Sequence, residues 1–355
     1  MGEVKLVPFT KTAETEDDLI AKLSARGLVF SDESELRSLL RTIGYYRMSG
    51  YLHSFRQPNS DNYKPGTTLE MVWRLYSFDR RMRLVAADAL ARIEIALRTL
   101  IVETHTAAQK GDPFAYANAA ALPKFSPSRF THFLAQIDDG VARAAKAAEP
   151  PVLHFRAKYS NPRLPVWAAM EYASFGDVTT YYEGLDVALQ QKIGDVFSAW
   201  PSGLVNWLEV IRRFRNICAH QGRIWNRKIN TRLKYNFSNN AALSDLWACV
   251  GSSQSCGYTT VFAALSLCAW LLKCVRPQSQ WTSRVKELLA DYPEVPLAAM
   301  GFPADWQKLA LWKDSDEEKE EDEAADSDKT DPSEPDSSEP DSANGDSSAV
   351  PAPAK

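Results

Sequence analysis

The segment from Leu69 to about Lys110 contains neither proline nor glycine. Its apolar residues recur at steps of three and four, which is the period of one face of an α-helix. Because proline and glycine are the usual helix breakers, this segment predicts a single helix of about 40 residues. The run Gly111-Asp112-Pro113 ends it.

Other segments carry the same helical signals. Thr15, followed by three acidic residues, is a good helix start, and Gly27 is a good stop. Ser31 with Asp32 and Glu33 opens a second helix. Further helices are expected over 128–148, 167–172, 186–199, 201–220, 241–249, 259–275 and 281–290. No strand run and no glycine-rich phosphate loop stands out, so the sequence predicts an all-α helical bundle.

Charge is unevenly spread along the chain. Residues 314–355 hold sixteen acidic and three basic residues, which leaves 29 acidic and 38 basic residues for 1–313. A basic body with an acidic tail is typical of nucleic-acid binders, although mild positive charge alone is common. The tail is almost free of apolar residues, so we expect it to be disordered. It either solubilises the protein or competes with RNA for the basic surface.

We expect a helical domain over 1–235, with helices of 236–313 packing on the same body.

Five cysteines, at positions 218, 249, 256, 268 and 274, form no CxxC pair and no zinc spacing with the five histidines. We therefore expect reduced thiols, no metal, no cofactor and a cytoplasmic location, because no signal peptide stands out. The longest apolar run, Val261 to Leu272, is shorter than the about 20 residues of a membrane helix. The sequence therefore predicts a soluble protein.

The helix expected over 201–220 has one apolar and one polar side. Its apolar side consists of Trp207, Val210, Ile211, Phe214, Ile217 and Cys218. Its polar side continues into the following loop and holds Glu209, Arg212, Arg213, Arg215, Asn216, His220 and Arg223. Arginine offers a charged fork and histidine moves protons near neutral pH, so this side suits a phosphate. Arg215 and His220 lie roughly 140° apart around the helix, so we expect a homodimer that gathers two such pairs.

Arg215 and His220 form an Arg-x4-His motif in the setting Phe214–His220, followed by Arg223–Arg227. Four further segments precede this motif in a fixed order: Leu19-x3-Leu23-x3-Gly27-Leu28, Ile43–Tyr51, Leu75–Arg83 and Arg92–Arg98. Together they resemble the HEPN ribonucleases, and more narrowly the AbiD/AbiF branch of abortive-infection proteins, over roughly residues 15 to 230. Gln221 is a departure, because many relatives carry a second histidine there.

The resemblance implies metal-independent cleavage of RNA by a toxin of bacterial antiphage defence. Such enzymes use the ribose 2′-hydroxyl as nucleophile, leave a cyclic phosphate, and are restrained by a small structured RNA. On this match, His220 is the acid/base, Arg215 holds the phosphate, and Asn216 orients by hydrogen bonding. Arg212 and Arg223 would hold flanking phosphates.

Three other groups of residues each have a functional and a structural interpretation. Tyr45, Tyr46 and Arg47 stack a base and grip a backbone, or they are half-buried packing residues. A basic run either binds along an RNA backbone or is a solvated surface. It contains Arg223, Trp225, Asn226, Arg227, Lys228, Arg232 and Lys234. Glu94, Arg98 and His105 share one side of the long helix, where an ion pair four residues apart is routine.

Two alternatives to a ribonuclease remain open at this stage. One is a non-catalytic protein that holds a structured RNA through Arg215 and His220. The other is a helical interaction protein without nucleic acid, which would show no salt-dependent binding to RNA.

Overall fold

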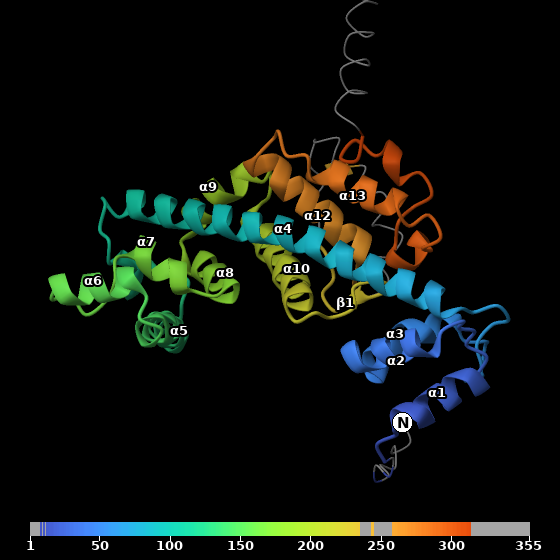
Figure 1. Ribbon diagram of the computed structural model, residues 1–355. Coiled ribbons are helices and arrows are strands. Elements are labelled where there is room, and N and C mark those ends of the chain that lie inside the picture. The colour runs from blue at the N-terminus through green and yellow to red at the C-terminus, as the bar shows by residue number, and fades with distance from the viewer. Residues whose placement is uncertain (1–7, 9, 11, 235–242, 245–257, 314–355) are drawn as a thin grey trace, which may run out of the picture. The chain divides into compact units, whose positions relative to one another are not determined.

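The structure is a computed structural model that describes residues 8, 10, 12–234, 243–244 and 258–313 (Figure 1). Residues up to Trp312 form one compact unit, and Lys313 begins a second one. The acidic tail, most of the helix expected over 241–249, and two cysteines (249 and 256) lie outside the described residues.

Helix α4, Leu69–Ala108, is the element on which most others pack, and it confirms the prediction of one helix of 40 residues. The hydroxyl of Thr68 accepts a hydrogen bond from the Met71 N–H and so caps its first turn. Near its start α4 contacts α3, Tyr45–Leu52 (Figure 1). Further along it contacts α10, Pro201–Ala219, α12, Val261–Val275, and α13, Trp281–Ala290. Helices α8, Phe175–Gly184, and α9, Val187–Val196, pack on it as well.

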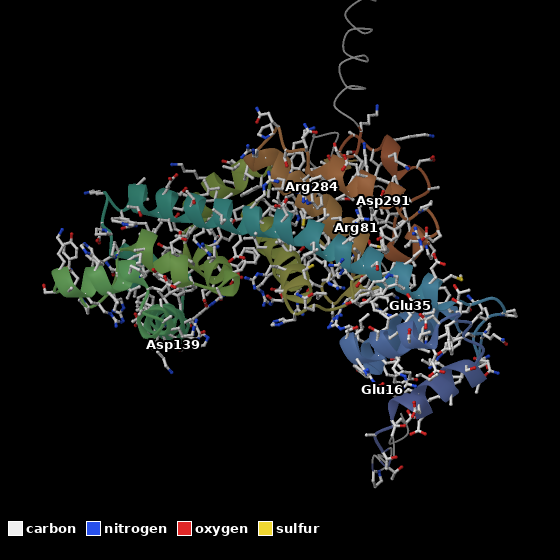
Figure 2. All side chains as sticks on the ribbon, in the orientation of Figure 1. Glu16, Glu35, Arg81, Asp139, Arg284 and Asp291 are labelled. Carbon is white, nitrogen blue, oxygen red and sulfur yellow. The ribbon has the colours of Figure 1, made fainter. Side chains whose placement is uncertain are left out.

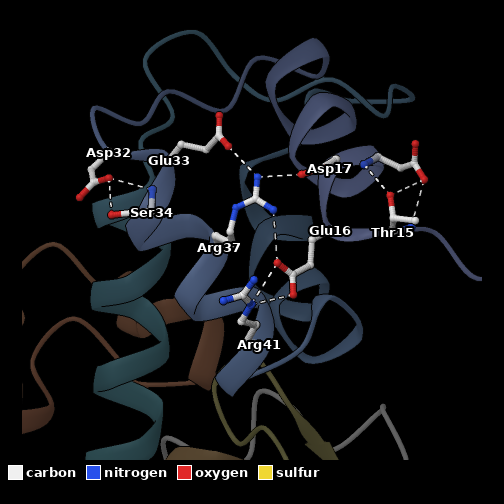
Figure 3. Close-up of polar contacts among 9 residues, drawn as sticks. Thr15, Glu16, Asp17, Asp32, Glu33, Ser34, Arg37 and Arg41 are labelled. Carbon is white, nitrogen blue, oxygen red and sulfur yellow. Dashed lines mark hydrogen bonds and ion pairs between the residues drawn. The ribbon is translucent and has the colours of Figure 1, made fainter.

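Helix α1, Glu16–Ala25, begins and ends where the sequence predicts, and helix α2, Glu33–Thr42, begins where the sequence predicts. Thr15 and Asp18 cap α1 reciprocally, and Gly27, with a φ of 91°, follows its end. Arg41 of α2 pairs with Glu16 of α1 at 2.8 Å and so joins the two helices (Figure 3). This hydrogen bond with Arg41 lowers the pKa of the Glu16 carboxyl. The pair is solvated, so the apolar residues beneath it contribute most of the stability.

The middle of the chain contains two helices that the sequence did not predict. The elements here are α5 Pro127–Lys146, α6 Pro150–Lys158, α7 Val166–Ala169, α8 Phe175–Gly184 and α9 Val187–Val196. Helix α6 has almost no buried side, so it lacks the apolar period of a packed helix. Helix α8 contains Gly176 and two threonines, which are poor helix formers, but Ser174 and Asp177 cap it reciprocally.

The last helices are α10 Pro201–Ala219, α12 Val261–Val275 and α13 Trp281–Ala290. Every residue from Val261 to Leu272 is buried, which accounts for the apolar run in the sequence. Within the described residues no helix is long and apolar enough to span a membrane. Short 3-10 turns cover His53–Phe55, Ala115–Ala117, Ala119–Ala121, Met170–Tyr172, Leu297–Met300 and Trp306–Lys308.

Helix α13 is attached to α4 by polar contacts as well as by packing. The indole N–H of Trp281 donates to the Val85 carbonyl at 2.8 Å. Arg81 pairs with Asp291 at 2.8 Å, in the region where Figure 2 labels both residues. These contacts fix the side of α4 that faces away from α3.

The all-α prediction is confirmed, with one small exception. Strand β1, Lys228–Ile229, pairs antiparallel with β2, Thr259–Thr260. Two residues are too few to produce the alternating pattern by which a strand is recognised in sequence. The pair joins the chain after α10 to the start of α12.

Candidate functional site

Helix α10 buries the apolar side that its sequence predicts. Trp207, Val210, Ile211, Phe214 and Cys218 are buried, and Ile217 is half-buried. This side contacts α4, α8 and α12. Burial raises the pKa of the Cys218 thiol to about 12, so the thiol stays protonated and is a packing group.

A tight turn ends α10 and sets the direction of His220. The Gly222 N–H donates to the Ile217 carbonyl at 2.8 Å, and the Gln221 N–H donates to Cys218 at 3.1 Å. Gln221 has a φ of 57°, so these residues form a Schellman motif with His220 as its cap. His220 is therefore exposed beyond the last helical turn.

Helix α3 lies against this turn and forms an open pocket with it. One guanidinium nitrogen of Arg47 donates to the Gln221 carbonyl at 2.6 Å, and Arg223 donates to the carbonyl of Gly50. The pocket has a volume of about 410 Å³. It is lined by Tyr46, Arg47, Ser49, Gly50, Tyr51, His220, Gln221, Gly222, Arg223 and Arg227.

This pocket, the His220 pocket, combines an imidazole with three guanidinium groups. Tyr46 is 93% exposed, so its ring is open to solvent at the pocket. The guanidiniums suit a phosphate, and an open ring suits an unpaired base. The structure thus brings together Tyr46, Arg47, His220, Arg223 and Arg227, which the sequence singled out in separate segments.

Arg215 does not line the His220 pocket of the same chain. Its Nε lies 3.3 Å from a carboxylate oxygen of Glu94, whose other oxygen pairs with Arg98 at 3.2 Å. Arg98 in turn pairs with Glu171 at 3.4 Å. The two ends of the motif therefore face different neighbours, as their angle around the helix predicts.

The other predicted residues of α10 have modest structural contacts. Arg212 pairs with Glu209 at 2.6 Å on the polar side of the helix. Asn216 is half-buried, and its carbonyl accepts the N–H of His220 at 3.0 Å.

The structure corrects the role expected of Trp225. This residue is 2% exposed, so its ring packs in the core and is not available to stack on RNA. Tyr45 also lies away from the pocket, because its hydroxyl accepts from Arg26 at 3.4 Å and its ring lies under Lys22. The remaining residues of the basic run, Asn226, Arg227, Lys228, Arg232 and Lys234, are exposed.

His105 has a structural environment on α4. It is buried, with Nδ1 2.6 Å from the Tyr181 hydroxyl and Nε2 3.1 Å from the Ala121 carbonyl. A carbonyl only accepts, so Nε2 carries the proton and Nδ1 accepts from Tyr181. Burial lowers the pKa of this imidazole. The structural interpretation of this group is confirmed, because Glu94 and Arg98 form the expected ion pair and His105 is buried. Glu94 also contacts Arg215.

A buried polar cluster, which sequence reasoning missed, lies behind the His220 pocket. Asp79 is fully buried and accepts hydrogen bonds from the Tyr51 hydroxyl at 2.7 Å and from the Ile224 N–H at 2.9 Å. It also accepts from the Trp225 N–H at 2.5 Å and pairs with Arg83. Burial, with the neighbouring Asp79 carboxylate, raises the pKa of the Tyr51 hydroxyl, which remains a donor.

A signal for this cluster was present in the sequence. Asp79 and Arg83 are four residues apart on the side of α4 that also carries Ala86 and Leu90. Charged residues on the apolar side of a helix are rarely buried unless they are paired. Among the described residues, no three His, Cys, Asp or Glu side chains are grouped as metal ligands.

The fold and this pocket define a helical protein with an open arginine–histidine site. The family model of the Abi-like proteins matches residues 38–226, which is just over half of the chain. The protein therefore belongs to the Abi-like family of abortive-infection proteins. Searches of curated proteins and of solved structures found no match.

Proposed function

We propose that this protein is a metal-independent endoribonuclease that acts as a toxin in bacterial abortive infection. The observation that supports it most is the His220 pocket, where an exposed imidazole lies among Arg47, Arg223 and Arg227. The family membership supports the role in defence, and a small structured RNA is the restraining partner we propose. Asn226, Lys228 and Arg212 would extend the RNA contact beyond the pocket.

The chemistry of these side chains suits transfer of the phosphoryl group from the 5′ oxygen to the ribose 2′ oxygen of the RNA backbone. A base removes the proton from the ribose 2′-hydroxyl, and the 2′ oxygen forms a bond to phosphorus. The bond from phosphorus to the 5′ oxygen breaks, and that oxygen takes a proton. His220 serves as acid or base, and proton transfer of this kind contributes about 10²–10⁴-fold. The guanidinium groups stabilise the charge that develops on the phosphate oxygens.

The complete site in this proposal needs a second copy of the chain, because Arg215 lies outside the His220 pocket. Helix α4 offers a self-complementary face for such a dimer. Leu84 and Ile95 are 60% and 59% exposed, and their separation of eleven residues is about three helical turns. Antiparallel pairing of two α4 helices sets each Leu84 against Ile95 of the second copy. Arg215 adjoins this face, because its partner Glu94 precedes Ile95.

The dimer has its own test, which needs no RNA. Leu84→Glu places charge in the proposed contact, opposite Ile95 of the second copy, and should give a monomer by light scattering. Leu153→Glu on α6, another exposed leucine, should leave the mass unchanged. A monomeric wild-type protein would refute the proposed interface.

The ribonuclease proposal is tested by incubating purified protein with RNA in EDTA. The wild type should yield products with 2′,3′-cyclic phosphate and 5′-hydroxyl ends. The double variant Arg215→Ala and His220→Ala should lose cleavage and keep its circular dichroism spectrum. His154→Ala on α6, an exposed histidine away from the pocket, is the matched control. Cleavage that persists in the double variant would exclude these residues as the site.

A non-catalytic RNA-binding protein is the second candidate. The separation of Arg215 from the His220 pocket within one chain favours it, because two separate cationic sites can hold RNA without cutting it. It predicts salt-dependent binding of RNA that is recovered intact.

A further inference from the structure

The turn that follows His220 is held by side chains from α3 and α4 at almost every residue. Arg47 donates to the Gln221 carbonyl, and Arg83 lies 3.5 Å from the Gly222 carbonyl. Arg223 reaches back to Gly50. Such a set of contacts leaves the backbone next to His220 little freedom.

Asp79 is the centre of this set. Its Oδ1 accepts the N–H groups of Ile224 and Trp225, and its Oδ2 accepts from Tyr51 and Arg83. It thereby joins α3, α4 and the turn through one buried carboxylate. A buried carboxylate with four donors is well compensated, and losing its charge leaves Arg83 buried without its counter-ion.

We propose that Asp79 is a positioning residue for His220, and that Tyr51 and Arg83 act through it. Asp79 does not line the pocket, but Tyr51, which donates a hydrogen bond to it, lines the pocket. The carboxylate sets where the turn lies against α3 and so sets the place of the imidazole relative to Arg47 and Tyr46. Catalytic groups must be held in place within a fraction of an ångström, because small displacements lower the rate steeply.

The substitution Asp79→Asn separates positioning from folding. An asparagine keeps the size of the side chain and one oxygen for the two N–H groups. Its amide nitrogen, however, is a donor and faces Tyr51 and Arg83, which are donors too. The turn must then shift relative to α3, while the apolar core around α4 stays intact. Asp88→Asn is the matched control, because Asp88 is also on α4 and pairs with Arg284, away from the pocket.

The first readout is independent of any reaction. The proton NMR signal of the His220 imidazole can be assigned by comparison with His220→Ala, since the chain has only five histidines. We expect this signal to move in Asp79→Asn and to stay in place in Asp88→Asn. An unmoved His220 signal in folded Asp79→Asn would overturn the proposal, whether or not the protein cuts RNA.

The second readout rests on the proposed function. In Asp79→Asn, kcat for RNA cleavage should fall about 10–100-fold with KM nearly unchanged, because RNA still meets the same surface groups. A purely structural role would lower the amount of folded protein and leave kcat per folded molecule unchanged. If the wild type cuts no RNA, the proposed function fails, and the NMR signal alone decides the positioning role.

A second variant keeps the proposal testable if Asp79→Asn does not fold. Tyr51→Phe removes one hydrogen bond to Asp79 and leaves its pair with Arg83 in place. The same two changes, in the His220 signal and in kcat, should appear with smaller size. A folded Tyr51→Phe protein with neither change would count against the proposal.

Discussion

Two arginine–histidine pairs lie on the main helices of this protein, and their surroundings differ. Arg98 and His105 are seven residues apart on α4, and Arg215 and His220 are five apart on α10 and its cap. His105 is buried with both ring nitrogens occupied, whereas His220 is exposed beside three guanidinium groups. Spacing alone does not distinguish them. Burial and neighbours do.

The cause of the difference is where each histidine lies on its helix. His105 is in the last turn of α4, on the side covered by Tyr181 of α8 and by Ala121. His220 caps α10 where the chain enters a left-handed turn, so its side chain leaves the packed face. His220 is thus exposed because it lies beyond the last turn of its helix, whereas His105 lies within the last turn, on the packed side.

The largest difference is expected in RNA cleavage. His220→Ala should reduce the rate by about 10²–10⁴-fold, because it removes the proposed proton-transfer group. His105→Ala, assayed at a temperature where it is folded, should keep the rate of the wild type within about threefold. Initial rates on a labelled RNA measure both. Equal losses would abolish the distinction between the two histidines.

Stability should show the reverse order. His105→Ala opens a cavity and leaves the Tyr181 hydroxyl and the Ala121 carbonyl without a partner, which costs about 2–4 kcal/mol of unfolding free energy. His220→Ala, at an exposed cap, should change it by less than about 0.5 kcal/mol. Urea denaturation of both variants provides the comparison. A stability loss at His220 larger than at His105 would contradict it.

Acid should weaken the fold through His105. Its pKa is lowered in the folded protein, so the unfolded chain takes up the proton first as the pH falls. The stabilisation is complete above the unfolded pKa of about 6.5 and is lost as the pH falls toward the folded value. The difference in melting temperature between the wild type and His105→Gln should therefore be smaller at about pH 5.5 than at about pH 7.5. A gap that stays constant would mean that this histidine is not the acid-sensitive group.

The smallest effect concerns the turn that exposes His220. Gln221 adopts a φ of 57°. This backbone conformation is less favourable for a residue with a Cβ atom than for glycine. Gln221→Gly should stabilise the protein by about 0.5–1 kcal/mol, whereas Gln221→Ala gains nothing. Gln221 lines the His220 pocket, but Arg47 binds its backbone carbonyl, which both variants keep, and the proposed reacting groups are other residues, so cleavage should persist. Indistinguishable stabilities of the two variants would show that the turn is unstrained.

The sequence predicts the helices that have a clear apolar period and fails where that period is absent. Helix α4 and the apolar side of α10 follow directly from residue spacing. Helix α6 is not predicted because it buries few side chains, and β1 is not predicted because it is two residues long.

The site is predicted in part for a similar reason. The separation of Arg215 from His220 follows from helical geometry. The meeting of α3 with the turn after α10 does not, because it depends on contacts between distant segments. Trp225 was misassigned because an aromatic residue among cations resembles an RNA-binding surface, and only the structure shows that it points into the core.

The contact between Asp79 and Ile224 joins residues 145 positions apart. During synthesis, α3 and α4 therefore leave the ribosome long before the turn that they hold. A growing chain has no ordered His220 pocket until nearly all of α10 and its following loop have emerged. Under the proposed function, a nascent chain therefore carries no complete site until about the first 225 of the 355 residues have been made.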